Sequence, residues 1–282
     1  MENSFLRLRV YNTDGHGVMM SLFDEASFKV LESRYSEYSL NNLNDEMTLA
    51  GCSTIDSLTI SNWDDFYCLG TELKPLLDQT QPTEIDIPAY LPETDNGKEC
   101  KKIINVFCND SLFTSKFEAG PKTLINPTEL EDKEYSDIIL GPRQKYQDAK
   151  NNSVVKLYWT GRFTILNTSL CMVADCAKDL EELLEGKPLD VLILSSTDGD
   201  NEFLENSFLE RFAPACILVA GKKISLYLKK DGSAEKRGIH TLHLESGDIV
   251  LYSGFHKKNS NVSQGDDTVG ADGQYAITEL SS

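Results

Sequence analysis

Residues 54–65 read TIDSLTISNWDD and join a short apolar run to a polar cluster. The run at 55–60 is short, rich in branched side chains and bounded by polar residues, which predicts a buried strand. The cluster at 61–65 then predicts a loop. Gly70 and Thr71 open a predicted helix that continues to about Asp78. This stretch therefore predicts a strand, a polar loop and a helix in direct succession.

The segments around this unit predict further strands. Residues 6–10 alternate apolar side chains with Arg7 and Arg9, the period of a strand with one wet face. The Gly-rich turn at 11–17 leads to a hairpin partner at 18–23. The spacer 79–134 carries five prolines and is interpreted as short strands and loops.

The second half repeats the pattern of strands and helices. Apolar stripes predict helices at 176–184 and 202–212. Strands are predicted at 154–159, 163–166, 189–194, 217–220, 239–244 and 248–252. Two strand-rich halves favour two sheets packed face to face with helices outside. We expect one large domain over residues 1–256 and a polar, partly flexible tail over 257–282.

Composition narrows the class of protein. The chain has 282 residues, of which 40% are hydrophobic and 26% charged, and this is typical of a globular protein. Its apolar runs are far shorter than the ~20 residues of a membrane helix, and its first residues lack the features of a secretion signal. The seven cysteines include no CxxC pair, which suits free thiols in a reducing cytosol. We therefore expect a cytoplasmic protein that does not contact membranes.

Charge narrows the class of partner. With 27 basic and 45 acidic residues the net charge is −18, so direct binding of nucleic acid is disfavoured. The acidic surface either keeps the protein soluble or meets a protein partner with a basic surface. The oligomeric state is not predicted.

Five stretches of the chain follow one another in a recognisable order. They are LRVYNTDGHG (8–17), TIDSLTIS (54–61) with the turn and helix at 69–77, LGP (140–142) with NNSVV (151–155), LDVLIL (189–194) with FL (203–204) and FAP (212–214), and the closing hairpin at 238–254. Together they resemble the metallo-β-lactamase fold family, and within it the hydrolase domain of the bacterial DNA-uptake competence channel (ComEC-like) and its free-standing relatives. The resemblance covers about residues 5–255 and implies an α/β fold, the αββα four-layer sandwich.

The metal ligands of that family are missing from the matching positions. Its first loop reads His-x-His-x-Asp-His, because imidazoles and a carboxylate hold two divalent ions there. The residues aligned with that loop here are Asn62, Trp63, Asp64, Asp65, Phe66 and Tyr67. A second loop, His-His-Gly-Ser in the family, is matched by Ser196, Thr197, Asp198 and Gly199. The late Gly-His-Pro is replaced within residues 222–228.

One bridging ligand has two possible equivalents. Asp175 matches the family's aspartate if the preceding hairpin is longer than usual, and otherwise 167–169, Asn-Thr-Ser, occupies the place. Asp175 has a second interpretation as the N-cap of the helix at 176–184. We therefore expect no cofactor, no bound metal and no catalytic residue, and a vestigial pocket formed by Asn62, Trp63, Asp64, Asp65, Tyr67, Asp175, Ser196, Thr197 and Asp198.

The sequence offers little support for other kinds of catalytic or metal site. The four histidines are His16, His240, His243 and His256, and the middle two point to opposite faces of one predicted strand. Cys68 and Cys176 adjoin apolar residues without a histidine beside them, which favours structural thiols. The large ring of Trp63 could plug the old cleft or contact a partner. Asp64, Asp65, Asp198 and Asp200 could instead hold Mg²⁺, Mn²⁺ or Ca²⁺.

Three functions follow as hypotheses. The first is a pseudoenzyme that keeps the fold and acts as a protein-binding or regulatory subunit, and the resemblance implies a bacterial defence or DNA-processing setting, including antiviral defence. The alternative is a phosphodiesterase or nuclease with a carboxylate-bound ion. The third is an acidic decoy that captures a basic nucleic-acid-binding protein.

Overall fold

The computed structural model describes residues 6–15, 17–24, 27–88, 91–110, 115–119, 135–140, 155–160, 163–168, 177–184, 189–195, 203–220, 224–244, 247–253, 268–269 and 275–281. Contacts divide the chain into two compact units. Unit 1 consists of Met1–Ile87, Leu91–Glu118 and Leu244–Ser282, and unit 2 of Pro88–Tyr90 and Ala119–His243. Each unit contains one sheet.

The sheet of unit 1 changes from antiparallel to parallel pairing at β3. Its order is β14-β15-β13-β1-β2-β3-β4-β5-β6. Strands β13, β1, β2 and β3 pair antiparallel, whereas β3, β4 and β5 pair parallel. The bounds are β1 Leu6–Val10, β2 Met20–Asp24, β3 Phe28–Leu31, β4 Ser57–Thr59, β5 Glu84–Pro88, β6 Ser115–Ala119, β13 Gly247–Ser253, β14 Thr268–Val269 and β15 Tyr275–Ser281.

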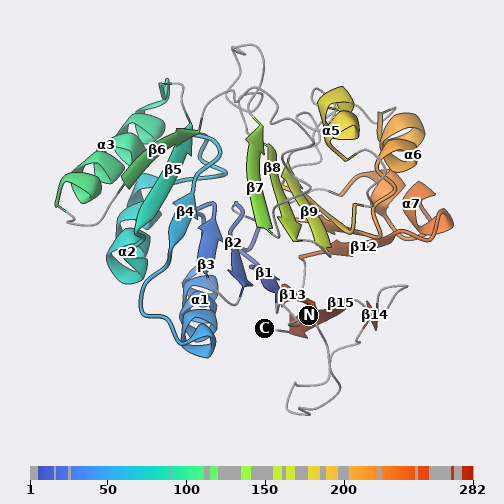
Figure 1. Cartoon of the computed structure of the whole chain (residues 1–282), viewed down its shortest axis with the longest axis horizontal. Helices are drawn as coiled ribbons and strands as arrows, with labels where there is room; N and C mark the ends of the chain where they lie inside the picture. Colours follow the sequence, from blue (N-terminus) through green and yellow to red (C-terminus); the bar gives the residue numbers. More distant parts are fainter. Residues whose placement is uncertain are drawn as a thin grey trace. The chain divides into compact units, whose positions relative to one another are not determined.

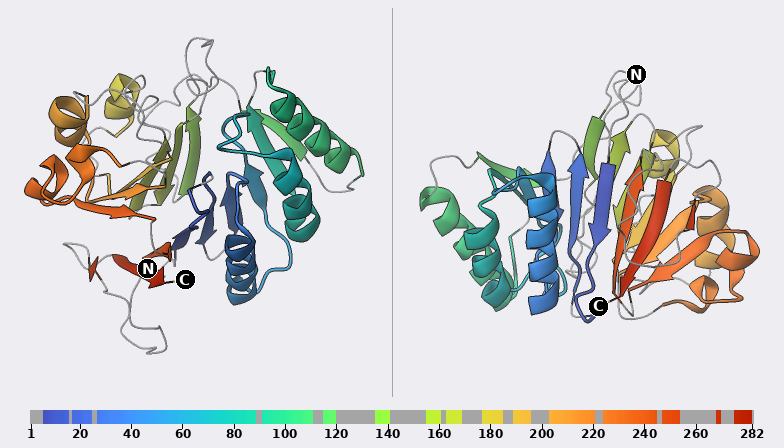
Figure 2. Two further views of the ribbon diagram at one scale, coloured as in Figure 1. Left: turned by 180° about the vertical axis from the view of Figure 1, so that it is seen from behind. Right: turned by 90° about the horizontal axis from the view of Figure 1, so that it is seen from below.

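Helices connect the parallel strands of unit 1, because parallel neighbours need a long crossover. Helix α1 (Glu37–Ala50) joins β3 to β4, and α2 (Gly70–Thr80) joins β4 to β5. A capping box of Ser36 and Ser39 begins α1, and Gly51 in the left-handed region ends it. Helix α3 (Asp95–Asp110) packs beside α2, and all three helices lie along one face of this sheet (Figures 1 and 2).

The sheet of unit 2 has a parallel half and an antiparallel half. Its order is β12-β11-β10-β9-β8-β7, with β12 to β9 parallel and β9 to β7 antiparallel. An apolar core beneath β9, β10 and β11 includes Leu180, Leu204 and Phe208, each fully buried. The bounds are β7 Tyr135–Leu140, β8 Val155–Thr160, β9 Phe163–Thr168, α5 Ala177–Leu183, β10 Val191–Leu194, η3 Phe203–Phe208, α6 Leu209–Arg211, β11 Cys216–Val219, η4 Leu226–Leu228, α7 Ser233–Lys236 and β12 His240–His243.

Most elements expected from the sequence are confirmed within a few residues, and two regions differ. The spacer interpreted as short strands and loops contains the 16-residue helix α3. The end of the predicted tail forms β15, which pairs with β13 over Tyr275–Ser281. Residues 257–267 lie outside the described residues. No helix in the described ranges is long and apolar enough to cross a membrane.

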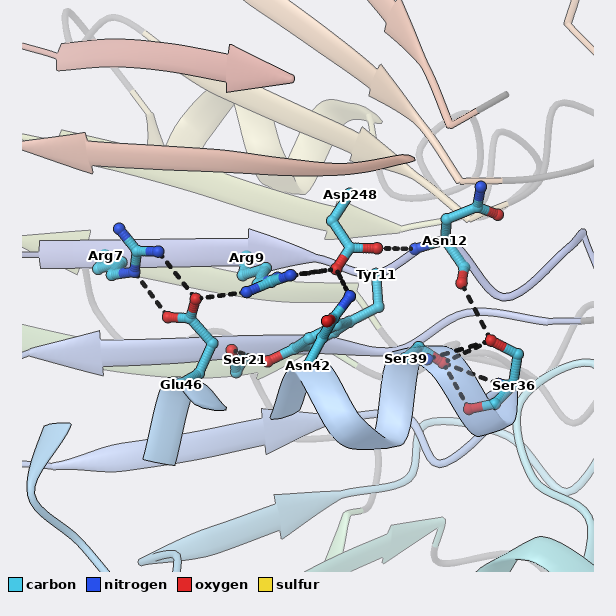
Figure 3. Close-up of polar contacts among 10 residues, drawn as sticks. All are labelled: Arg7, Arg9, Tyr11, Asn12, Ser21, Ser36, Ser39, Asn42, Glu46 and Asp248. Atoms are coloured by element: carbon cyan, nitrogen blue, oxygen red, sulfur yellow. Dashed lines mark hydrogen bonds and ion pairs between the residues drawn. The ribbon is translucent and has the colours of Figure 1, made fainter. Parts of the chain in front are cut away.

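Charged side chains between β1 and α1 form a buried network, shown in Figure 3 and called the Arg9 network here. Arg9 lies between Glu46 of α1, at 2.7 Å, and Asp248 of β13, also at 2.7 Å. Arg7 adds a second pair to Glu46 at 2.6 Å. The guanidinium of Arg9 also lies 5.3 Å from the ring centroid of Tyr11. Two cations therefore balance two carboxylates inside unit 1.

Lowering the pH is expected to reduce the stability of unit 1, because the Glu46 carboxylate becomes protonated. Burial alone would raise the pKa of Glu46, but hydrogen bonds and charge from Arg7 and Arg9 outweigh burial and lower it. A lowered pKa in the folded state gives stability that is present above the unfolded pKa of about 4.3 and is lost as pH falls through the folded pKa. Urea unfolding below about pH 5 should show this loss. Glu46→Gln should flatten the profile there, whereas Asp45→Asn, at an exposed neighbour, should leave it as steep as before.

Candidate functional site

The loop that follows β4 and precedes α2, residues 61–69, carries the first group of predicted site residues. The loop begins beside the parallel strands β3, β4 and β5 and ends at the first turn of α2. The backbone N–H of Ser61 donates to Glu32 Oε2 at 3.0 Å, so the loop begins at a buried carboxylate. We call this segment the β4–α2 loop.

Polar side chains of the β4–α2 loop hold the loop's own backbone. Asn62 Oδ1 accepts from the N–H of Asp64 at 2.8 Å, and Asp64 Oδ1 accepts from the N–H of Phe66 at 3.0 Å. The Asp64 carbonyl accepts from both Tyr67 and Cys68. Such Asx turns satisfy backbone groups locally. These two side chains therefore have a structural task within the loop.

Trp63 is a core residue of unit 1. Its side chain is 2% exposed, and Asn62 beside it is fully buried. A Cβ added at Gly97, in the first turn of α3, would lie 3.0 Å from Trp63 Cβ, so glycine permits this close packing. This burial favours a role for the ring in filling the interior over a surface contact, and the expected plugging of the old cleft stays a prediction. Tyr67 is also buried, whereas Asp65 is exposed.

Arg34 braces the outer part of the β4–α2 loop. Its guanidinium donates to the Asp65 carbonyl and pairs with Glu72 of α2 at 2.8 Å. Gly17, from the turn after β1, packs directly on this brace. A Cβ there would lie 2.3 Å from Arg34 Cβ and 2.5 Å from the Phe66 carbonyl oxygen, so only glycine fits. Three separate segments of unit 1 therefore hold the loop in place.

Glu32 is a site residue that sequence reasoning missed. It is 1% exposed and has φ 59°, a left-handed conformation that is costly for a residue with a side chain. Its N–H donates to the Thr59 carbonyl at 2.8 Å, and its side-chain carboxylate accepts from the N–H of Ser61. No local pattern marks Glu32 as a partner of Ser61, or Arg34 as a partner of Glu72, because each pair is brought together by the crossover through α1.

Two buried thiols lie at the end of the β4–α2 loop, Cys68 in the loop itself and Cys100 in α3. Cys68 and Cys100 are fully buried, and Asn96 of α3 bridges them by donating to the Cys68 carbonyl at 3.0 Å and accepting from Cys100 Sγ at 3.8 Å. A hydrogen bond to Cys100, then burial, raises the pKa of Cys68 well above its usual range. Burial likewise raises the pKa of Cys216 to about 12. These described thiols agree with the expected structural role, and Cys176 lies outside the described residues.

The second group of predicted site residues lies outside the described residues. It comprises Asp175, Ser196, Thr197, Asp198 and Asp200, so their meeting with the first loop stays a prediction. Asn167, the other candidate for the bridging position, is described near the end of β9 and is 4% exposed. Its Oδ1 is buried with no hydrogen-bond partner among the described residues. A neutral amide therefore stands at this strand end.

The described histidines form no cluster. His240 and His243 lie at the two ends of β12, and His240 is exposed. His16 and His256 lie outside the described residues. Within the described ranges, no three His, Cys, Asp or Glu side chains are placed to share a metal ion.

Comparison with known proteins rests on structure alone, because neither a protein-family model nor a curated protein sequence matches the chain. A metallo-β-lactamase fold protein, YhfI from Bacillus subtilis, superposes with a TM-score of 0.54 at 10% identity over 89% of this chain and 100% of that one. The chain has the metallo-β-lactamase fold. Igni18, a metallo hydrolase from Ignicoccus hospitalis, gives 0.51 at 8% over 89% and 100%. Zn²⁺-bound PqqB from Methylobacterium extorquens gives 0.51 at 12% over 80% and 85%.

The residues of the β4–α2 loop do not by themselves fit the pair of metal ions that the family resemblance implies. Zinc takes imidazole, thiolate or carboxylate ligands. The β4–α2 loop offers the buried amide of Asn62, the indole of Trp63 and the carboxylate of Asp64, one oxygen of which already accepts from Phe66. Only Asp65 is exposed, and a single free carboxylate cannot hold two ions. We therefore derive no metal-dependent step for this chain.

Proposed function

We propose that this metallo-β-lactamase-fold protein is catalytically inactive and acts as a protein-binding or regulatory subunit. The strongest support is that the side chains of the β4–α2 loop stabilise the loop and the interior of unit 1. Asn62 and Asp64 hold backbone N–H groups and Trp63 fills the interior, so positions that would face a metal maintain the fold instead. Side chains with this structural role are what we expect of a protein that keeps its fold in order to bind a partner.

The proposed partner is a protein with a basic surface, because the chain carries a net charge of −18. The resemblance to the ComEC-like hydrolase domain supports a setting in bacterial DNA processing or defence. The free thiols of the described cysteines support the cytoplasm as the location. Asp65 is the exposed acidic residue of the loop and the proposed point of contact.

Metal loading tests the loss of catalysis. The full chain is stripped with EDTA, reloaded separately with Zn²⁺, Mn²⁺ and Mg²⁺, desalted and measured by elemental analysis. We expect far less than one ion per chain, and no hydrolysis of single-stranded DNA or bis-p-nitrophenyl phosphate above buffer. The Asp64→Ala/Asp198→Ala variant is the control, because any ion that it retains is adventitious. Stoichiometric metal that this variant loses, together with DNA hydrolysis, would establish the carboxylate-site hydrolase instead.

A second experiment tests the proposed partner. Affinity capture from the source organism is repeated over a series of salt concentrations, and electrostatic contacts should weaken steeply with salt. Asp65→Lys should reduce capture of the identified partner more than Asp78→Lys, which changes the same charge at an exposed position of α2. Equal capture by both variants would contradict a role for the loop.

A further inference from the structure

Two thiols of unit 1 are in contact where the β4–α2 loop meets α3, and we call them the thiol pair. Cys68 lies at the end of the loop, and Cys100 lies in the second turn of α3. Both residues are 0% exposed, and the two thiols are hydrogen-bonded to each other. The proposed function uses neither of them.

Asn96 of α3 holds the thiol pair together. Its Nδ2 donates to the Cys68 carbonyl at 3.0 Å, and its Oδ1 accepts from the Gly70 N–H at 3.0 Å and from Cys100 Sγ at 3.8 Å. A Cβ at Gly70 would lie 3.3 Å from Glu99 Cγ, so glycine lets α3 approach the end of the loop closely. Contacts on both sides of the pair therefore keep the two sulfur atoms next to each other.

Cys216 and Cys52 show that contact, rather than burial, distinguishes the thiol pair. Cys216 of unit 2 is also 0% exposed, but burial is what raises its pKa, with no contribution from a second thiol. Cys52 donates to the Met47 carbonyl at 3.5 Å. Neither of these two thiols is placed beside another one in the described part of the chain.

We propose that Cys68 and Cys100 form a disulfide when hydrogen peroxide oxidises the protein, which cross-links the β4–α2 loop to α3. One thiol attacks a peroxide oxygen, the O–O bond breaks, and a sulfenic acid and water result. The second thiol then attacks the sulfenic sulfur, so that the S–S bond forms, the S–O bond breaks and a second water leaves. Two thiols are oxidised and one peroxide is reduced to two waters. This inference is independent of the proposed loss of catalysis.

Contact favours the second step, whereas burial slows the first. Because the sulfur atoms are held together, the second step is intramolecular and needs no encounter in solution. The hydrogen bond to Cys100, then burial, raises the pKa of Cys68, so the pair should react more slowly than an exposed thiol. The cross-link joins residues 32 positions apart and restricts the unfolded chain, so the oxidised protein should be harder to unfold.

Peptide mapping tests the proposal on the full chain. The reduced protein is treated with hydrogen peroxide, its remaining thiols are blocked with N-ethylmaleimide in denaturant, and its peptides are analysed by mass spectrometry without reductant. We expect a cross-linked peptide that carries Cys68 and Cys100, and an alkylated Cys216. Cys68→Ala and Cys100→Ala should each abolish this peptide. Cys216→Ala is the matched control at an equally buried thiol and should retain it.

Urea unfolding gives a second measurement. The midpoint of the oxidised wild-type protein should be higher than that of the reduced protein, and dithiothreitol should reverse the shift. Cys68→Ala should show no such shift, and circular dichroism should confirm that the variants are folded. The proposal would be overturned if Cys68 and Cys100 stayed alkylated while Cys52 was oxidised. A cross-link from either residue to one of the other five cysteines, in place of this pair, would also overturn it.

Discussion

Replacing Asp248 by alanine is expected to lower the free energy of unfolding by about 3–5 kcal/mol, because it leaves a buried cation with half of its partners. Asp248 is 1% exposed and accepts from Arg9, from the N–H of Asn12 at 2.7 Å and from Asn42 Nδ2 at 2.8 Å. The change leaves all three donors without this acceptor. Urea unfolding followed by circular dichroism measures the loss.

Two further variants separate charge from shape. Asp248→Asn retains the size of the side chain and removes its charge, so we expect a loss smaller than that of alanine. Asp78→Ala breaks the exposed pair with Lys74 and should change stability by no more than about 0.5 kcal/mol. If Asp248→Ala cost as little as Asp78→Ala, the Arg9 network would not be a stabilising element.

Replacing Trp63 by alanine is expected to cost about 3–5 kcal/mol, the range for a buried large aromatic side chain. The ring fills the interior between the β4–α2 loop and the start of α3, and the neighbouring elements can close the resulting space only in part. Unfolding in urea, monitored by circular dichroism rather than tryptophan fluorescence, gives the value.

Leu49→Ala is the matched control for Trp63, because Leu49 is 73% exposed and its truncation should cost less than about 0.5 kcal/mol. Trp63→Phe should retain part of the lost stability. The opposite pattern, a stable Trp63→Ala protein that no longer captures its partner, would assign the ring to a binding surface and contradict the filling role.

The strands of the core were predictable because their side chains alone encode them. The apolar runs at β10 and β11 are fully buried, and Leu204, Phe208 and Phe212 form the buried stripe expected from their spacing. The β4–α2 loop was also predictable, since its polar residues follow an apolar run directly. Comparison with solved structures confirmed the fold class that these elements imply.

Helix α3 and strand β15 were missed for different reasons. Prolines on both sides of α3 suggested loops, although Cys100 and Ile104 lie four residues apart and are both fully buried. β15 has a weak local pattern, and pairing with β13 along its whole length stabilises it. Its backbone hydrogen bonds come from a partner strand that precedes it by more than twenty residues, and local propensity does not report such pairing.

By itself, the sequence determined most of the strands, the position of the polar loop and the amide, indole and carboxylate groups that this loop carries. Only the tertiary structure decided how those groups are used. Arg34 and Glu72 meet at the loop because α1 connects β3 to the neighbouring parallel strand β4, and Asp248 reaches Arg9 because β13 pairs with β1. Burial and hydrogen bonding depend on residues far apart along the chain, and their energies arise only when the sheet brings those residues together.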